Sequence, residues 1–115
     1  MTCVEPQKAT KQEMAAFHTD EYISFLESVT TKPIASDAAK LYMHNVFEDC
    51  PVFPGLYDFC RSSAGSSIGG AVALNCRDSV IAINWSGGLH HAMRSAASGF
   101  CYVNDIVLAI LELLK

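Results

Sequence analysis

The feature that most constrains this chain is residues 79–85, which read SVIAINW and combine β-branched and aromatic side chains in a short run. Asp78 precedes the run and Ser86-Gly87-Gly88 follows it, so turn-forming residues bound it on both sides. Its apolar residues are not restricted to alternate positions, which is typical of a strand buried on both faces in a parallel sheet covered by helices. We therefore predict a strand here and an α/β fold.

The first half of the chain shows helical spacing with one interruption. Thr10 and Glu13 have the spacing of a capping box, and apolar residues follow at helical intervals, which predicts one or two short helices within residues 11–29. Residues 30–40 contain a proline and small polar residues and predict a loop. Residues 41–55 hold two prolines but also many apolar side chains, so we expect an irregular segment that lies against the protein.

Two further helices are predicted in the second half. Residues 56–74 place apolar side chains on one face, and their Gly- and Ser-rich middle is expected where another backbone comes close. Residues 103–115 are apolar around most of the helix, which is typical of a buried helix. A strand covered on both faces needs parallel neighbours, yet no second segment has comparable strand character. We expect an incomplete piece of a parallel-sheet fold, mostly helical with one firm strand, in one partial domain at residues 1–115.

Composition and charge exclude several classes of protein. Half of the 115 residues are apolar and 17% are charged, so the chain is not of the disordered kind. The net charge is −4 and the basic residues are scattered, which disfavours direct binding to nucleic acid or to an anionic membrane surface. The longest apolar run, residues 106–111, is too short to span a membrane, and residues 1–10 lack the apolar core of a signal peptide. We expect a soluble protein that is not secreted by a standard signal.

The five cysteines form an odd set without a CxxC pair. This pattern disfavours both a disulfide framework and a zinc site of the Cys type. We expect reduced thiols in a cytosolic or nuclear compartment, most of them buried as small apolar side chains.

The best chemical candidates are the tandem histidines His90 and His91, in the loop that follows the predicted strand. In an open α/β sheet, ligands bind at the carboxyl ends of the strands. A glycine-rich loop can turn both imidazoles into one pocket for proton transfer or metal binding. The alternative is two ordinary loop histidines, and the HH dipeptide alone does not decide between these readings.

Three other patterns have simpler explanations. Residues 65–69 match GxSxG but lie inside a predicted helix, whereas a nucleophile elbow follows a strand directly, so we expect a packing face of small residues. Asn84-Trp85-Ser86 is formally a glycosylation sequon, but it ends the predicted buried strand, so we expect no glycosylation. Asp20 is interpreted as an N-terminal cap or first-turn acid of a helix.

The stretch at residues 81–112, which contains WSGGLHHAMRSAASGFCYVNDIVLAILE, resembles the class I histone deacetylases, a family of zinc-dependent lysine deacetylases. HTDEY at residues 18–22, Asn45, and EDCP at residues 48–51 are similar to the family in the same order. The resemblance covers roughly residues 9–115. It implies a piece of the arginase/deacetylase-type parallel-sheet fold that lacks the family's N-terminal start and its downstream metal-ligand half.

The resemblance also implies roles for single residues. His90 and His91 would be the catalytic pair that moves protons around a zinc-bound water. Five other residues would bind the substrate. Gly99, Phe100 and Cys101 would line the lysine tunnel and its floor. Leu89 would lie near the acetyl group, and Asp20 would be the rim carboxylate that holds the substrate's backbone amides. No metal ligand is assigned to this chain, because the family's Asp-x-His pair, further Asp and oxyanion-stabilising Tyr align beyond Lys115.

Two classes of function follow. As an enzyme of the family, the chain would take part in removing acetyl groups from histone lysines to repress transcription. Its substrate would be acetylated histone tails. Its location would be the nucleus and also the cytoplasm. As a non-catalytic interaction module or truncated product, it would bind corepressor or deacetylase partners. For the chain alone we expect no bound zinc and no activity, because metal catalysis needs metal ligands. The class I details of residues 100–114 disfavour a relative that deacetylates polyamines or other small molecules.

Overall fold

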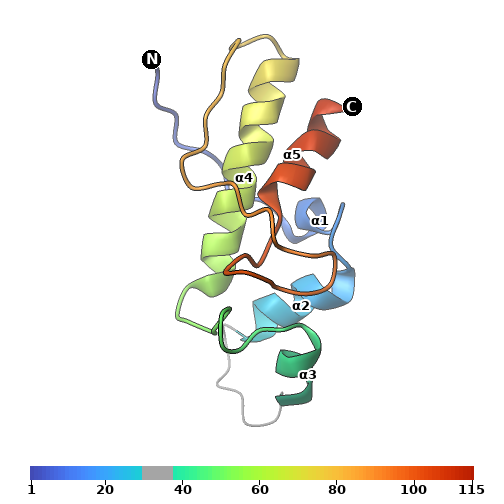
Figure 1. Cartoon of the computed structure of the whole chain (residues 1–115). Coiled ribbons are helices and arrows are strands. Elements are labelled where there is room, and N and C mark those ends of the chain that lie inside the picture. The colour runs from blue at the N-terminus through green and yellow to red at the C-terminus, as the bar shows by residue number, and fades with distance from the viewer. Residues whose placement is uncertain (30–37) are drawn as a thin grey trace.

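The structure is a computed structural model that describes residues 1–29 and 38–115. The described chain is built mainly from helices and their connections (Figure 1). In chain order the helices are α1 (Lys11–Met14), α2 (Asp20–Val29), α3 (Ala38–Met43), α4 (Leu56–Asn75) and α5 (Asp105–Leu113). The β-structure recorded within the described residues is an isolated bridge between Ser98 and Cys101.

The start of the chain follows its sequence signals closely. The Thr10 side chain accepts a hydrogen bond from the Glu13 amide at 3.0 Å, and the Thr10 amide donates to the Glu13 carboxylate at 2.8 Å. This reciprocal capping box begins α1, and α2 begins at Asp20, so the prediction of short helices within residues 11–29 is confirmed. Asp20 is a first-turn acid of α2, where the helix dipole favours a negative charge.

The predicted loop at residues 30–40 lies partly outside the described residues. Its described end, residues 38–40, already belongs to α3, so the loop prediction is wrong there. The reason is local, because two alanines and a lysine are good helix formers once the proline has been passed. The irregular segment predicted for residues 41–55 is wrong at residues 41–43, which complete α3. From residue 44 to the start of α4 the chain is irregular as predicted, and Val46 and Cys50 anchor it in the core.

The long helix α4 confirms the prediction for residues 56–74. Gly65 in its middle is buried against the backbone of residues 7–9, and a Cβ atom there would overlap the Gln7 carbonyl. The close approach lets the Ala9 amide donate to the Arg61 carbonyl at 2.9 Å, while Arg61 Nε donates to the Ala9 carbonyl at 2.9 Å. The GxSxG pattern is therefore part of a packing helix, as expected.

Helix α5 packs beside α4, which confirms a helix within residues 103–115 but not its burial (Figure 1). Leu108 faces the core, whereas Ile110, Leu113 and Leu114 are exposed. The prediction of a helix buried on most sides is wrong for the described chain, because α4 is the helix that covers α5 there and it covers one face.

The predicted strand at residues 79–85 is also wrong. This segment is neither strand nor helix, and it runs as a single extended chain back along α4 (Figure 1). Val80 is 94% exposed and Trp85 is 86% exposed, so the apolar side chains that predicted double-sided burial lie at the surface. A strand exists only through hydrogen bonds to a neighbour, and no described segment pairs with this one.

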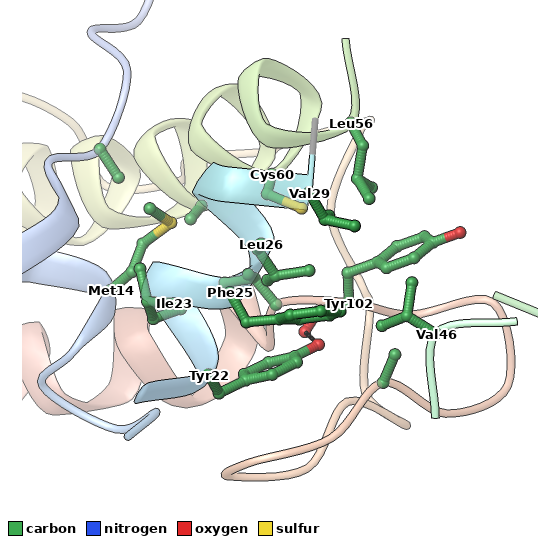
Figure 2. Close-up of a cluster of buried hydrophobic side chains, with 14 of the residues drawn as sticks. Met14, Tyr22, Ile23, Phe25, Leu26, Val29, Val46, Leu56, Cys60 and Tyr102 are labelled. Carbon is green, nitrogen blue, oxygen red and sulfur yellow. Dashed lines mark hydrogen bonds between the residues drawn. The ribbon is translucent and has the colours of Figure 1, made fainter. Parts of the chain in front are cut away.

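The core gathers around α2 (Figure 2). Met14 and Ile23 lie on one side of the cluster, and Tyr102 and Val46 lie on the other (Figure 2). The Tyr22 hydroxyl donates to the Tyr102 carbonyl at 2.6 Å, which ties α2 to the chain just before α5. This bond satisfies a polar group that is otherwise surrounded by apolar side chains.

The five cysteines are free thiols. Three of them are buried, as predicted for most of the set, and the exposed ones are Cys3 and Cys76. None of the helices among the described residues is both long and apolar enough to cross a lipid bilayer.

Candidate functional site

The tandem histidines lie in the loop between the extended segment and α5. Their ring centroids are 4.2 Å apart with 40° between the ring planes, so the loop turns two sequence neighbours toward one another. His90 Nδ1 lies 3.0 Å from the Gly88 carbonyl, and since a carbonyl only accepts, Nδ1 carries the proton in this bond. Both rings are exposed in the described chain.

The turn of residues 98–101 lies against this pair. Gly99 and Phe100 have φ angles of +49° and +69°, and the flanking residues Ser98 and Cys101 exchange backbone hydrogen bonds of 2.8 and 2.9 Å. Positive φ at both central residues is the mark of a type I′ turn. A Cβ on Gly99 would lie 2.9 Å from Cγ and Cδ2 of His91, so the absence of a side chain at this position leaves room for the imidazole.

The other two members of the turn point in different directions. The Phe100 side chain is 72% exposed, whereas Cys101 is buried and its thiol donates to the Gly99 carbonyl at 3.4 Å. His91, Gly99, Phe100 and Cys101 are thus brought together around one turn.

Leu89 and Asp20 are the remaining residues that the sequence singled out. Leu89 is half-buried directly before the pair. Asp20 is exposed at the start of α2, and no hydrogen bond or ion pair joins it to the histidines within the described residues. Its neighbour Thr19 reaches the same loop, because the Thr19 amide donates to the Arg94 carbonyl at 3.1 Å.

Sequence reasoning missed two residues that hold the histidine loop from α5. Asn104 caps α5 by accepting from the Val107 amide, and its side-chain amide donates to the carbonyls of His90 and Ala92 at 3.4 and 3.1 Å. Asp105 is buried and accepts from the Leu89 amide at 2.9 Å. The position of Asn104 before a helix is a capping signal, but nothing local indicates its contacts with the loop.

Two buried histidines hold the same loop from the other side. His18 Nε2 accepts from the Asn104 amide at 2.9 Å, and its Nδ1 donates to the Arg94 carbonyl at 3.1 Å. Burial lowers the pKa of His18, which agrees with the neutral ring that these two bonds require. His44 Nδ1 donates to the Ser95 carbonyl at 2.7 Å. These histidines are structural parts of the site.

Over residues 1–29 and 38–115, no group of three or more His, Cys, Asp or Glu side chains lies where it could hold a metal ion. A catalytic zinc ion takes three protein ligands and leaves one position open. The described residues alone therefore do not supply the ligand set of a catalytic zinc ion.

The comparisons with known proteins agree on one family. The histone deacetylase domain matches residues 1–115. Over all 115 residues the chain is 57% identical to histone deacetylase HDAC1 of Drosophila melanogaster and 54% identical to histone deacetylase 1 of Homo sapiens. It is 61% identical over 112 residues, 96% of the chain, to histone deacetylase 6 of Arabidopsis thaliana.

The chain spans 22% of the Drosophila protein and 24% of each of the other two. The match nevertheless extends over the whole of this sequence and includes the histidine pair, the turn beside it and the residues that hold both. The chain belongs to the histone deacetylase family.

Proposed function

We propose that this chain carries the proton-transfer pair and the lysine-binding turn of a class I histone deacetylase, whose reaction removes acetyl groups from histone lysines. The observation that carries the proposal is the contact of His91 with Gly99, beside a His90 ring 4.2 Å away, in a chain that matches the family throughout.

The chemistry of the pair follows from its hydrogen bonds. His90 donates through Nδ1 to the Gly88 carbonyl, so its Nε2 holds the lone pair that can accept a proton. An imidazole changes charge near neutral pH, which makes it suited to take a proton from an attacking water and return one to a leaving amine. A second imidazole alongside lets one ring act as base while the other acts as acid.

The substrate contacts are carried over from the family. Gly99, Phe100 and Cys101 would form the tunnel for the acetylated lysine and its floor, and Leu89 would lie near the acetyl group. Asp20 would hold the backbone amides of the substrate at the rim, for which its exposure is suited. We also propose that the chain is a piece of the arginase/deacetylase-type parallel-sheet fold, although the described residues supply helices and almost no strand.

A second candidate function rests on the missing donor set. Because the described residues do not fit a zinc ion, we derive no metal-dependent step from them, and the chain alone is proposed to be inactive. In this reading it is a non-catalytic interaction module that binds corepressor or deacetylase partners. In both readings we propose a nuclear protein that also occurs in the cytoplasm.

A chimera tests the enzyme proposal. Residues 1–115 would replace the matched segment of the Drosophila relative, and turnover of an acetyl-lysine peptide would be measured. We expect an active chimera in which His91→Ala lowers kcat by roughly 10²- to 10⁴-fold, the usual contribution of a general acid or base.

Met93→Ala is the matched control, because this exposed loop residue lies two positions from the pair and outside the proposed machinery. A His91→Ala chimera as active as its parent would remove the role proposed for the pair. A chimera without activity would favour the interaction module.

A further inference from the structure

Asp105 holds the backbone that leads into the histidine pair. Its Oδ1 accepts from the Leu89 amide at 2.9 Å and from the Gly88 amide at 3.1 Å, and its Oδ2 accepts from the Gly88 amide at 3.1 Å and from the Ser67 hydroxyl at 2.5 Å. The carboxyl group thereby contacts the two residues directly before His90.

The carboxylate needs these donors in place. Asp105 is 1% exposed, and within the described residues no lysine, arginine or histidine forms an ion pair with it. A buried charge without a cation depends on its hydrogen bonds and on nearby dipoles, here the N-terminal end of α5. Two of its three donors are backbone amides of the histidine loop, so the loop and the carboxylate stabilise one another.

Helix α4 fixes the other side of the network. Asn84 Nδ2 donates to Ser67 Oγ at 2.8 Å and to the Ser63 carbonyl at 3.1 Å, and the Ser63 hydroxyl donates to the Ser86 carbonyl at 2.8 Å. The serines are one helical turn apart and lie on the same face of α4. The Ser-rich part of α4 thus contacts the segment before the histidine pair, through Ser63 and the Ser86 carbonyl, and also packs against residues 7–9 at Gly65.

Gly87 makes the arrangement possible. A Cβ atom at this position would overlap Oδ2 of Asp105 and would lie 2.8 Å from Asn84 Nδ2. Only a residue without a side chain lets the backbone pass this close to the carboxylate.

We propose that Asp105 is a positioning residue that sets the orientation of the His90 and His91 rings by holding the backbone of Gly88 and Leu89. This inference rests on the proposed function, since the pair must act on protons for its orientation to matter. It assigns to α5 a role in the site that is separate from substrate contact.

The test is made on the 115-residue chain by NMR, with hydrogen exchange at the loop amides and the imidazole nitrogen signals of all four histidines. Asp105→Ala removes every acceptor, and Asp105→Asn replaces one acceptor oxygen by a donor. We expect exchange of the Gly88 and Leu89 amides to rise about tenfold or more, as the loss of hydrogen bonds to a charged group implies, with Asn intermediate.

The imidazole signals separate positioning from general stability. The signals of His90 and His91 should move, while those of His44, which is buried in the core and bonded to the Ser95 carbonyl, should stay unchanged. Gly87→Ala should give the same local pattern without any change to the carboxylate, and Glu112→Gln, a change in α5 away from the loop, should give none.

Two results would overturn the inference. Loop amides that exchange within about twofold of the parent in both Asp105 variants would show that the carboxylate does not hold the loop. Movement of all four histidine signals together in every variant would make Asp105 a residue of general stability. Neither result depends on turnover, so each would refute the positioning role of Asp105 and leave the proposed function untouched. The proposed function is refuted by a different result, a His91→Ala chimera as active as its parent.

Discussion

At the scale of single residues, the site depends on groups that fit only in one backbone or protonation state. Gly99 occupies a positive φ and faces the His91 ring. His18 is held as a neutral imidazole between the Arg94 carbonyl and the Asn104 amide. Gly99 contacts His91, and His18 binds the Arg94 carbonyl in the same loop. A substitution at either residue should therefore change the conformation of the loop that carries the histidine pair.

Gly99→Ala is expected to destabilise the folded chain by about 1–3 kcal/mol, because a side chain at positive φ is strained and its Cβ would press on His91. Urea unfolding measures the loss, and the His91 imidazole signals should shift with it. Gly69→Ala is the matched control. Gly69 lies in α4 with nothing within 4 Å of an added Cβ, so alanine should stabilise by about 0.5–1 kcal/mol. Equal effects of the two changes would contradict the contact with His91.

The free energy of unfolding should fall in acid because of His18. Burial lowers the pKa of His18 in the folded state below its ordinary value of 6.5, so below that pH the unfolded chain takes up a proton that the folded chain resists. The contribution is complete above pH 6.5 and is lost as the pH falls toward the lowered pKa. Urea unfolding of the parent and of His18→Gln between about pH 5 and pH 8 measures it. A variant with the same slope against pH as the parent would exclude His18 as the source.

At the scale of elements, two segments expose apolar side chains that local pattern marks for burial. The extended residues 79–85 carry Val80 and Ile81 at the surface, and α5 carries Ile110 and Leu114 there. A groove between α4, the extended segment and α5 is lined by residues that include Ala82 and Leu113. Apolar surface gathered in this way marks a place of association.

We therefore expect the chain to self-associate or to require a partner in solution. Light scattering should report species larger than a monomer, and an apolar dye should bind. A double variant with Val80→Lys and Ile81→Lys should reduce both signals, while Lys8→Gln, a change at an exposed residue of the N-terminal segment, should reduce neither. A monodisperse monomer that melts cooperatively and binds no dye would refute the expectation.

At the scale of the whole molecule, segments distant in sequence support one loop. The connection between α1 and α2 supplies His18, and the chain after α3 supplies His44 and Asn45. The side chains of these three residues bind carbonyls of residues 94–97. Helices α4 and α5 hold the preceding turn through Ser67 and Asp105. The chain thus builds a scaffold for the histidine pair, while its described residues supply no set of metal donors.

The isolated chain is accordingly expected to hold no stoichiometric zinc and to leave acetyl-lysine peptides intact. A catalytic zinc ion needs three protein ligands to give a bound water at neutral pH the reactivity of hydroxide. Metal analysis after dialysis and a peptide assay in added zinc are the measurements. About one zinc ion per chain, together with turnover that His90→Ala abolishes, would contradict this and require a ligand set that the structure does not reveal.

Local interactions are what the sequence could determine. The capping box of Thr10 and Glu13 and the helices within residues 11–29 and 56–74 follow from contacts between residues a few positions apart, so they were predictable. The motif around His90 and His91 could be recognised from the sequence because its residues are contiguous along the chain.

Only the tertiary structure decided what distant segments do to one another. The SVIAINW run has strand character, but no segment among the described residues pairs with it and it stays an exposed extended segment. Within the same residues α5 packs mainly against α4 and keeps an open face. Asp105 reads as an ordinary first-turn acid, and His18 lies 86 residues from the Asn104 amide that it accepts from. Hydrogen bonds and burial depend on proximity in space, which a pattern along the chain records only for near neighbours.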